Sequence, residues 1–204
     1  MALIDTGFAA LLGAHTLDEL DREPGSVVGL WPDGRIALLN GAWQRFAEQN
    51  QGIDALRRWP IGADLLSGIS GVLRDYYTRA FASVREQCQP WEQTYQCHSP
   101  LVRRQFRLRA LPLEQRALLL VHSTIVEAPF AGSEPDAGST VAAPDLEEYV
   151  GPNGMVRQCS NCRRTQHGTS GSWDWVRSYV TQAPSNVSHG ICNTCLRQDY
   201  PDLR

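Results

Sequence analysis

Two Cys-x-x-Cys pairs constrain the fold of this chain more than any other feature. Cys159 and Cys162 form the first pair, Cys192 and Cys195 form the second, and 29 residues lie between the pairs. A two-residue gap lets both sulfurs of a pair point at one ion, and four thiolates satisfy the tetrahedral coordination of Zn²⁺. The sequence therefore predicts one zinc ion bound by these four cysteines, and a redox-active or structural disulfide is the competing interpretation.

Side chains near the pairs add to the predicted site. Arg157, Arg163 and Arg164 surround the first pair and are expected to favour thiolates over thiols. His189 stands three residues before Cys192. Three roles are open for it: an alternative ligand in place of one cysteine, a hydrogen-bond donor to a thiolate, or a residue that fixes the turn.

The stretch from 127 to 145 separates the cysteine pairs from the first part of the chain. It is rich in proline, glycine, serine and alanine, and it lacks the apolar period of a helix or a strand. We interpret it as a flexible linker. It divides the chain into an N-terminal helical segment (1–23), a domain (24–126) and a four-cysteine module (146–204). A module of about 60 residues is small for a hydrophobic core alone, so a metal would supply stability.

Charge and hydropathy exclude several classes of function. All 19 basic residues are arginine; residues 1–126 carry 13 of them against 13 acidic residues, and residues 145–204 carry 6 against 6. Neither half has the basic footprint that attracts a nucleic-acid backbone, so nucleic-acid binding is not expected. No run approaches the roughly 20 apolar residues of a membrane span, and no secretion signal is visible. We expect a cytoplasmic protein without a membrane partner.

The domain over 24–126 begins with a predicted hairpin and a helix. Two apolar runs, 26–31 and 35–39, flank a Pro-Asp-Gly turn, which predicts the hairpin. Asn40 follows directly and is the expected N-cap of a short helix over 41–50.

A longer helix and three strands complete the domain. The helix is predicted over 72–87, and the apolar spacing indicates a buried face made of Val72, Tyr76, Ala80, Phe81 and Val84. Strand-like runs follow over 91–97, 102–111 and 117–125. The predicted order is therefore two strands, helices and three strands.

This order resembles that of a PAS domain, with the turn Pro32-Asp33-Gly34-Arg35 and with Trp43 and Phe46 after Asn40. The resemblance implies an α+β fold: a five-stranded antiparallel sheet with helices on one face that enclose a pocket. PAS domains sense a small molecule, bind a cofactor or pair with another copy. The resemblance thus implies a ligand of unknown identity and a homodimer formed through a helix within 2–20. His98 and His122 are interpreted as packed or solvated residues rather than haem ligands.

The region 149–202 resembles a Cys-rich tail attached to PAS and receiver domains in bacterial signalling proteins. The resemblance rests on Cys159-Ser-Asn-Cys162-Arg163, Trp173, Tyr179-Val180, Ser188-His189-Gly190-Ile191-Cys192-Asn-Thr-Cys195 and Tyr200-Pro201. We expect a small zinc-ribbon or treble-clef-like module. Between the pairs, the spacing of Trp173, Val176, Tyr179 and Val180 predicts a short helix that ends before Pro184.

Together these features predict a bacterial signal-transduction protein without enzymatic activity. A PAS sensor or docking domain would be linked to a zinc-stabilised protein-interaction module, and the protein would act through a kinase or a regulator. One alternative is a thiol/zinc redox sensor. The other is a nucleic-acid-binding regulator or a metal-dependent nuclease, against which the neutral charge and the absence of a His-rich motif argue.

Overall fold

The two apolar runs that flank the Pro-Asp-Gly turn form the predicted hairpin. In the computed structural model, which describes residues 1–49, 57–97, 102–129, 140–141, 144–176, 178–179 and 183–200, they are the antiparallel strands β2 (Ser26–Leu30) and β3 (Ile36–Leu39). Gly34 closes the turn with φ 88°, a left-handed conformation that glycine adopts without strain, and its N–H donates to the carbonyl of Trp31 at 2.9 Å.

Asn40 begins helix α2 (Gly41–Gln49), as predicted, and also ties the hairpin to its surroundings. Its Oδ1 accepts from the N–H of Trp43 at 3.0 Å and from the N–H of Val27 at 2.9 Å. Its Nδ2 donates to the carbonyls of Leu20 and Gly25, both at 3.0 Å. The side chain is fully buried, so these bonds also satisfy its polar atoms away from water.

The long helix α4 (Val72–Gln87) has the predicted bounds, and its buried face agrees with the prediction at Phe81 and Val84 but is shifted by one residue in its first half. Val72 is 46% exposed, and the buried residues are Leu73, Tyr77, Phe81 and Val84. The sequence contains two overlapping apolar stripes, because Val72-Leu73 and Tyr76-Tyr77 are both apolar pairs. Packing buries the second stripe: the ring centroids of Tyr77 and Phe81 lie 6.2 Å and 6.3 Å from that of Trp91, while Tyr76 contacts the same ring at 5.9 Å but stays half-buried.

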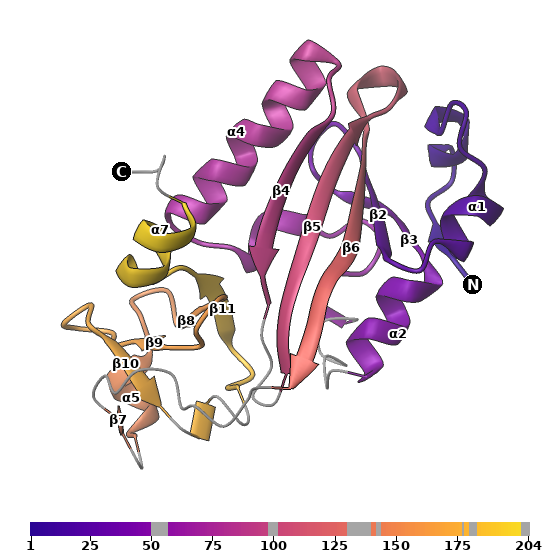
Figure 1. The fold of residues 1–204 in the computed structure, drawn as a ribbon. Helices are drawn as coiled ribbons and strands as arrows, with labels where there is room; N and C mark the ends of the chain where they lie inside the picture. Colours follow the sequence, from indigo (N-terminus) through magenta and orange to yellow (C-terminus); the bar gives the residue numbers. More distant parts are fainter. Residues whose placement is uncertain are drawn as a thin grey trace. The chain divides into compact units, whose positions relative to one another are not determined.

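The three final strands of the domain are present: β4 (Trp91–Gln96), β5 (Val102–Pro112) and β6 (Leu118–Pro129), the last of which runs past its predicted end at 125 into the start of the predicted linker (Figure 1). Within the described ranges the sheet has six strands in the order β1-β3-β2-β6-β5-β4, because β1 (Leu3–Ile4) adds to the edge of β3. The expectation of five strands was therefore one too few. Strands β2 and β6 pair antiparallel, with Ser26 opposite His122 and Leu30 opposite Leu118.

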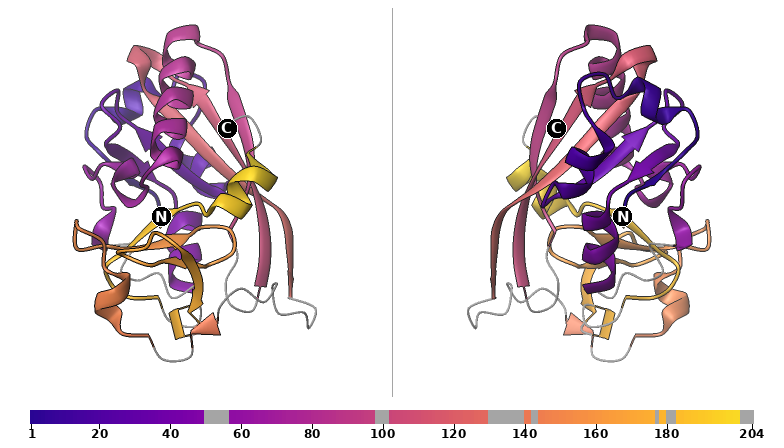
Figure 2. Two further views of the ribbon diagram at one scale, coloured as in Figure 1. Left: turned by 90° about the vertical axis from the view of Figure 1, so that its left-hand side faces the viewer. Right: turned by 90° about the vertical axis from the view of Figure 1, so that its right-hand side faces the viewer.

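The first 22 residues cover one face of this sheet, which corrects the expectation of helices on one face alone. They include η1 (Phe8–Leu11) and α1 (Leu17–Arg22), which begins with a capping box between Thr16 and Glu19. Figure 2 shows this segment and α4 on different sides of the strands. The apolar cluster on the N-terminal side contains Phe8, Leu11, Leu12, Leu20, Val27, Leu38, Leu119 and Val121.

Because successive residues of a strand point to opposite faces, a sheet covered on both sides has continuous apolar strands. All four residues of β3 and the last four of β2 are buried. Gly29 allows the close approach of the N-terminal segment, since a Cβ at this position would collide with the ring of Phe8. A homodimer would have to use residues other than these buried ones.

A second sheet contains the cysteine pairs. Its strands in the described part of the chain are β7 (Thr140–Val141), β8 (Val156–Cys159), β9 (Thr165–Gln166), β10 (Trp173–Val176) and β11 (Val187–Gly190), in the order β11-β8-β9-β10-β7. The helix predicted from Trp173 is wrong in its first part, because Trp173–Val176 is a strand that pairs with β9 and β7, whereas 178–179 are helical. Trp173, Trp175 and Val176 are aromatic or β-branched, which favours a strand, and a run of four residues is too short to separate the two periods.

Short helices complete the description: η2 (Leu65–Gly68), η3 (Glu114–Arg116), α5 (Leu146–Tyr149) and α7 (Asn193–Asp199). The chain divides into two compact units, 1–67 with 76–94 and 106–125, and 68–75 with 95–105 and 126–204. Most of the predicted linker, His98 and Val180 lie outside the described residues. Among the helices that are described, none has the length and apolar content needed to span a bilayer.

Candidate metal centre

The first cysteine pair lies on the tight turn between β8 and β9. Cys159 is the last residue of β8, and Cys162 precedes Arg163, whose φ of 66° turns the chain back. The N–H of Cys159 donates to the carbonyl of Arg164 at 2.7 Å, and the N–H of Arg163 donates to the carbonyl of Cys159 at 3.0 Å. These backbone bonds hold the two sulfurs of the pair on one side of the turn.

The second pair is carried by the start of α7. Cys192 is the N-cap residue of this helix, and Cys195 lies in its first turn. Strands β8 and β11 pair in parallel with Gly190 opposite Cys159, so the ends of both strands lie side by side. The N–H of Ser160 donates to the carbonyl of Gly190 at 2.9 Å and fixes this junction. Parallel pairing thus brings together cysteines that are about 30 residues apart in the chain.

The four sulfur atoms form one cluster. All four lie within 4.8 Å of one another, and the Sγ atoms of Cys162 and Cys192 are 3.6 Å apart. Four thiolates at the usual Zn–S distance of about 2.3 Å form a tetrahedron with edges of about 3.8 Å. A disulfide would require about 2.05 Å, and all four cysteines are free thiols. The donor set and its spacing therefore fit a metal ion.

The environment of the cluster favours the anionic form at Cys159 and Cys192, whereas hydrogen bonds with the neighbouring thiols raise the pKa of Cys162 and Cys195. Cys159 and Cys192 are buried, and the N–H of Cys192 donates to Cys159 Sγ at 3.4 Å. A hydrogen bond from the thiol of Cys162 lowers the pKa of Cys159 to about 7, and hydrogen bonds from the other thiols, that of Cys159 first, lower the pKa of Cys192. A bound divalent cation would supply the positive charge that lets all four sulfurs lose their protons.

Two of the neighbouring arginines form hydrogen bonds with glutamine side chains. The Nη1 of Arg157 donates to Gln166 Oε1 at 3.1 Å, and the Nη1 of Arg163 donates to Gln158 Oε1 at 3.3 Å. The leading causes of the lowered thiol pKa values are the sulfur neighbours themselves. The electrostatic effect of the three arginines on the thiols stays a prediction.

His189 lies in β11 and stands opposite Gln158 in β8. Its carbonyl accepts from the N–H of Ser70 at 3.0 Å, which joins the segment 68–75 to β11 within the unit that contains the cysteines (the cysteine unit). Within the described residues, the group of side chains that could hold a metal consists of the four cysteines and does not include His189. Its role as an alternative ligand or as a donor to a thiolate stays a prediction.

The first unit contains a small cavity between α2 and the sheet. Its volume is about 140 Å³, and its lining includes Arg45 and Phe46 from α2 and Phe106 and His122 from the strands. The rings of Phe46 and Phe106 meet edge to face at 5.7 Å. Burial lowers the pKa of His122 to about 4, so the imidazole is neutral at pH 7. The cavity is smaller than the roughly 300–1,000 Å³ of typical small-molecule sites.

Comparison with known proteins identifies no family. No protein-family model matches the sequence, and no curated protein matches it. Among solved structures, a domain of an HTR-like protein from Haloarcula marismortui ATCC 43049 is similar with 17% sequence identity and a TM-score of 0.37. That match covers 51% of this chain and 100% of the other. A TM-score of this size reflects a loose likeness and carries no argument about function.

Proposed function

We propose that this chain is a signal-transduction protein in which a PAS-like domain (24–126) is joined to a zinc-stabilised protein-interaction module (146–204). The observation that carries the proposal is the cluster of four cysteine sulfurs within 4.8 Å of one another. Sites with four cysteine ligands are typically structural, since they leave no open coordination position for a substrate. The module would therefore present a surface to a partner such as a kinase or a regulator rather than catalyse a reaction.

The PAS-like assignment is supported by the local agreement between pattern and structure. The five strands expected from the resemblance all form, together with the helix capped by Asn40. The small volume of the cavity beside His122 favours docking over the sensing of a large ligand.

The experiment that tests the zinc proposal is native mass spectrometry of the full chain, purified under reducing conditions. We expect one zinc ion per chain. A chelator should remove it and broaden or collapse the amide resonances of 146–200 while the resonances of the first unit stay dispersed. A chain that lacks stoichiometric metal and keeps these resonances unchanged contradicts the proposal.

A thiol-based redox sensor is the second candidate. Cys162 is half-buried whereas Cys159 and Cys192 are buried, so one sulfur of the cluster is within reach of a small oxidant. Peroxide would then release the zinc and disorder the module. Oxidation of the exposed Cys88 serves as an internal reference. Retention of zinc at roughly millimolar peroxide, once Cys88 is oxidised, would exclude the redox sensor and favour a structural zinc.

A further inference from the structure

A pocket of about 350 Å³ opens in the cysteine unit, away from the sulfur cluster itself. Its floor is a row of three polar side chains on adjacent strands, Gln166 on β9, Arg157 on β8 and Ser188 on β11, and all three line it. The register explains the row, because Ser188 stands opposite Arg157 and the pairing of Gln158 with Thr165 brings Gln166 next to Arg157. The volume lies at the lower end of the range for small-molecule sites.

Two loops form the walls, and hydrogen bonds hold each of them. In the loop before β8, the N–H of Gly151 donates to the carbonyl of Met155 at 2.9 Å, and the N–H of Met155 donates to Asn153 Oδ1 at 3.2 Å. In the loop between β9 and β10, the Nδ1 of His167 accepts from the N–H groups of Thr169 and Ser170, both at 3.3 Å. The pocket walls are thus preformed rather than dependent on a ligand.

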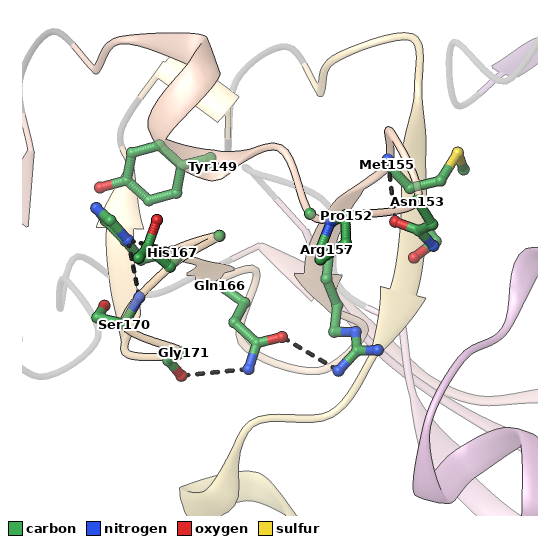
Figure 3. A pocket seen from close by; sticks show the side chains of 13 residues that line it. Tyr149, Pro152, Asn153, Met155, Arg157, Gln166, His167, Ser170 and Gly171 are labelled. Carbon is green, nitrogen blue, oxygen red and sulfur yellow. Dashed lines mark hydrogen bonds between the residues drawn. The ribbon is translucent and has the colours of Figure 1, made fainter.

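The Arg157 guanidinium is held at the floor of this pocket. Its Nη1 donates to Gln166 Oε1 at 3.1 Å, and Gln166 Nε2 donates in turn to the carbonyl of Gly171 at 3.2 Å (Figure 3). The aliphatic stem of Arg157 crosses β11 at Gly190, where a Cβ would come within 3.1 Å of Cδ. Figure 3 shows Asn153 and Met155 to one side of this pair and His167 and Ser170 to the other.

The fixed charge in the lining of the pocket is positive. Arg157 is the lining side chain with a fixed charge, and none of the lining residues is an aspartate or a glutamate. Among the described residues no carboxylate forms an ion pair with Arg157, whose hydrogen-bond partner is the neutral amide of Gln166. A half-buried guanidinium with a neutral partner keeps donors in a fixed fork that matches a carboxylate or a phosphate.

We propose that this pocket binds a small anionic molecule through a carboxylate or phosphate group placed on Arg157. Asn153, Gln166 and Ser188 provide further polar groups around the anion, and Pro152 and Met155 provide an apolar wall for the rest of the molecule. Because Arg157 is two residues before Cys159 and Ser188 is four before Cys192, the occupied pocket adjoins both strands that lead to the cysteine cluster. The proposal goes beyond the interaction module by giving that module a ligand.

The test uses the full chain loaded with zinc and three separate probes: succinate, citrate and inorganic phosphate. Each is titrated at constant ionic strength against sodium chloride, while amide resonances are followed by NMR. We expect at least one probe to shift the resonances of Arg157 and of the 167–172 loop in a saturable way. Saturation by phosphate alone assigns a phosphate-bearing ligand, and saturation by the acids assigns a carboxylate. The absence of saturable shifts with all three probes overturns the proposal.

Two variants locate the binding. Arg157→Gln removes the charge, and because a hydrogen bond to a charged group is worth about 1.5–3 kcal/mol we expect affinity to fall about tenfold or more. Gln166→Glu keeps the guanidinium but gives it a carboxylate partner, so it should compete with the anion and weaken binding equally. The zinc content of each variant is measured. If Arg157→Gln loses its zinc, Gln166→Glu still tests the proposal. Arg22→Gln is the control: Arg22 is exposed, pairs with Asp18 and lies outside this unit, so this variant should bind the anion with native affinity. Native affinity in both pocket variants would refute the assignment.

Discussion

The two sheets of this protein are stabilised by different means. The six-stranded sheet is covered on both faces, and its central strands are apolar throughout. The sheet that carries the cysteines has a small apolar cluster of Tyr149, Val156, Val176 and Val187, and next to it the four sulfurs. Polar side chains such as Gln158 and Thr165 are buried in the second sheet. Buried apolar area therefore stabilises the first sheet, whereas the second sheet would depend on the proposed metal ion for stability.

Removal of one sulfur should have the largest effect and should be confined to the second sheet. Structural zinc contributes about 10–16 kcal/mol to the folding of zinc-finger peptides, so a site with three ligands should lose its metal and its order. We expect Cys192→Ser to abolish stoichiometric zinc and to collapse the amide resonances of 146–200. Cys88→Ser, an exposed cysteine outside the cluster, is the matched control and should keep the zinc. A Cys192→Ser chain with an ordered module would show that apolar packing suffices there too.

Replacement of Asn40 should destabilise the first sheet without affecting the metal. Asn40→Ala removes the helix cap and leaves the buried N–H of Val27 and the carbonyl of Leu20 without this partner, which we expect to cost about 3 kcal/mol. Urea denaturation followed by resonances of β2 and β6 measures the loss. Gln44→Ala on the same helix, whose side chain makes an exposed bond, should change stability by less than about 0.5 kcal/mol. Equal effects of both variants would contradict the role of Asn40.

Acid should weaken the first sheet through His122, with a smaller effect. The folded pKa of about 4 lies below the ordinary value of 6.5, so the unfolded chain binds the proton more readily. The contribution of His122 to the free energy of unfolding is therefore fully present above pH 6.5 and falls as the pH drops toward 4. We expect up to about 2 kcal/mol of this free energy to be lost between pH 7 and pH 5.

The measurement is urea denaturation at both pH values, with β2 and β6 resonances as probes so that acid release of zinc from the other unit does not interfere. His122→Gln should flatten the pH dependence of the first sheet. His15→Gln, at an exposed histidine, should leave it unchanged. A native slope in His122→Gln would show that another group titrates.

Local chemistry predicted much of the structure before any coordinates. The turn at Gly34 and the cap at Asn40 depend on backbone conformation and on hydrogen bonds to near neighbours, and both are as predicted. The bounds of α4 were predicted for the same reason. The buried face of that helix was predicted only at Phe81 and Val84, since two apolar stripes overlap at Val72-Leu73 and Tyr76-Tyr77 and packing within the domain decides between them. The segment from Trp173 failed because a four-residue run has no decisive period until β7 and β9 pair with it.

The sequence by itself determined which residues could serve as metal ligands, because two closely spaced thiols at each of two places are a local pattern. The tertiary structure decided how the two pairs meet, since parallel pairing of β8 with β11 is a contact between distant segments. It alone also placed the first 22 residues on the sheet and Arg157 on the floor of a pocket, away from a role beside the sulfurs. Such placements depend on packing and register across the chain, which no local pattern encodes.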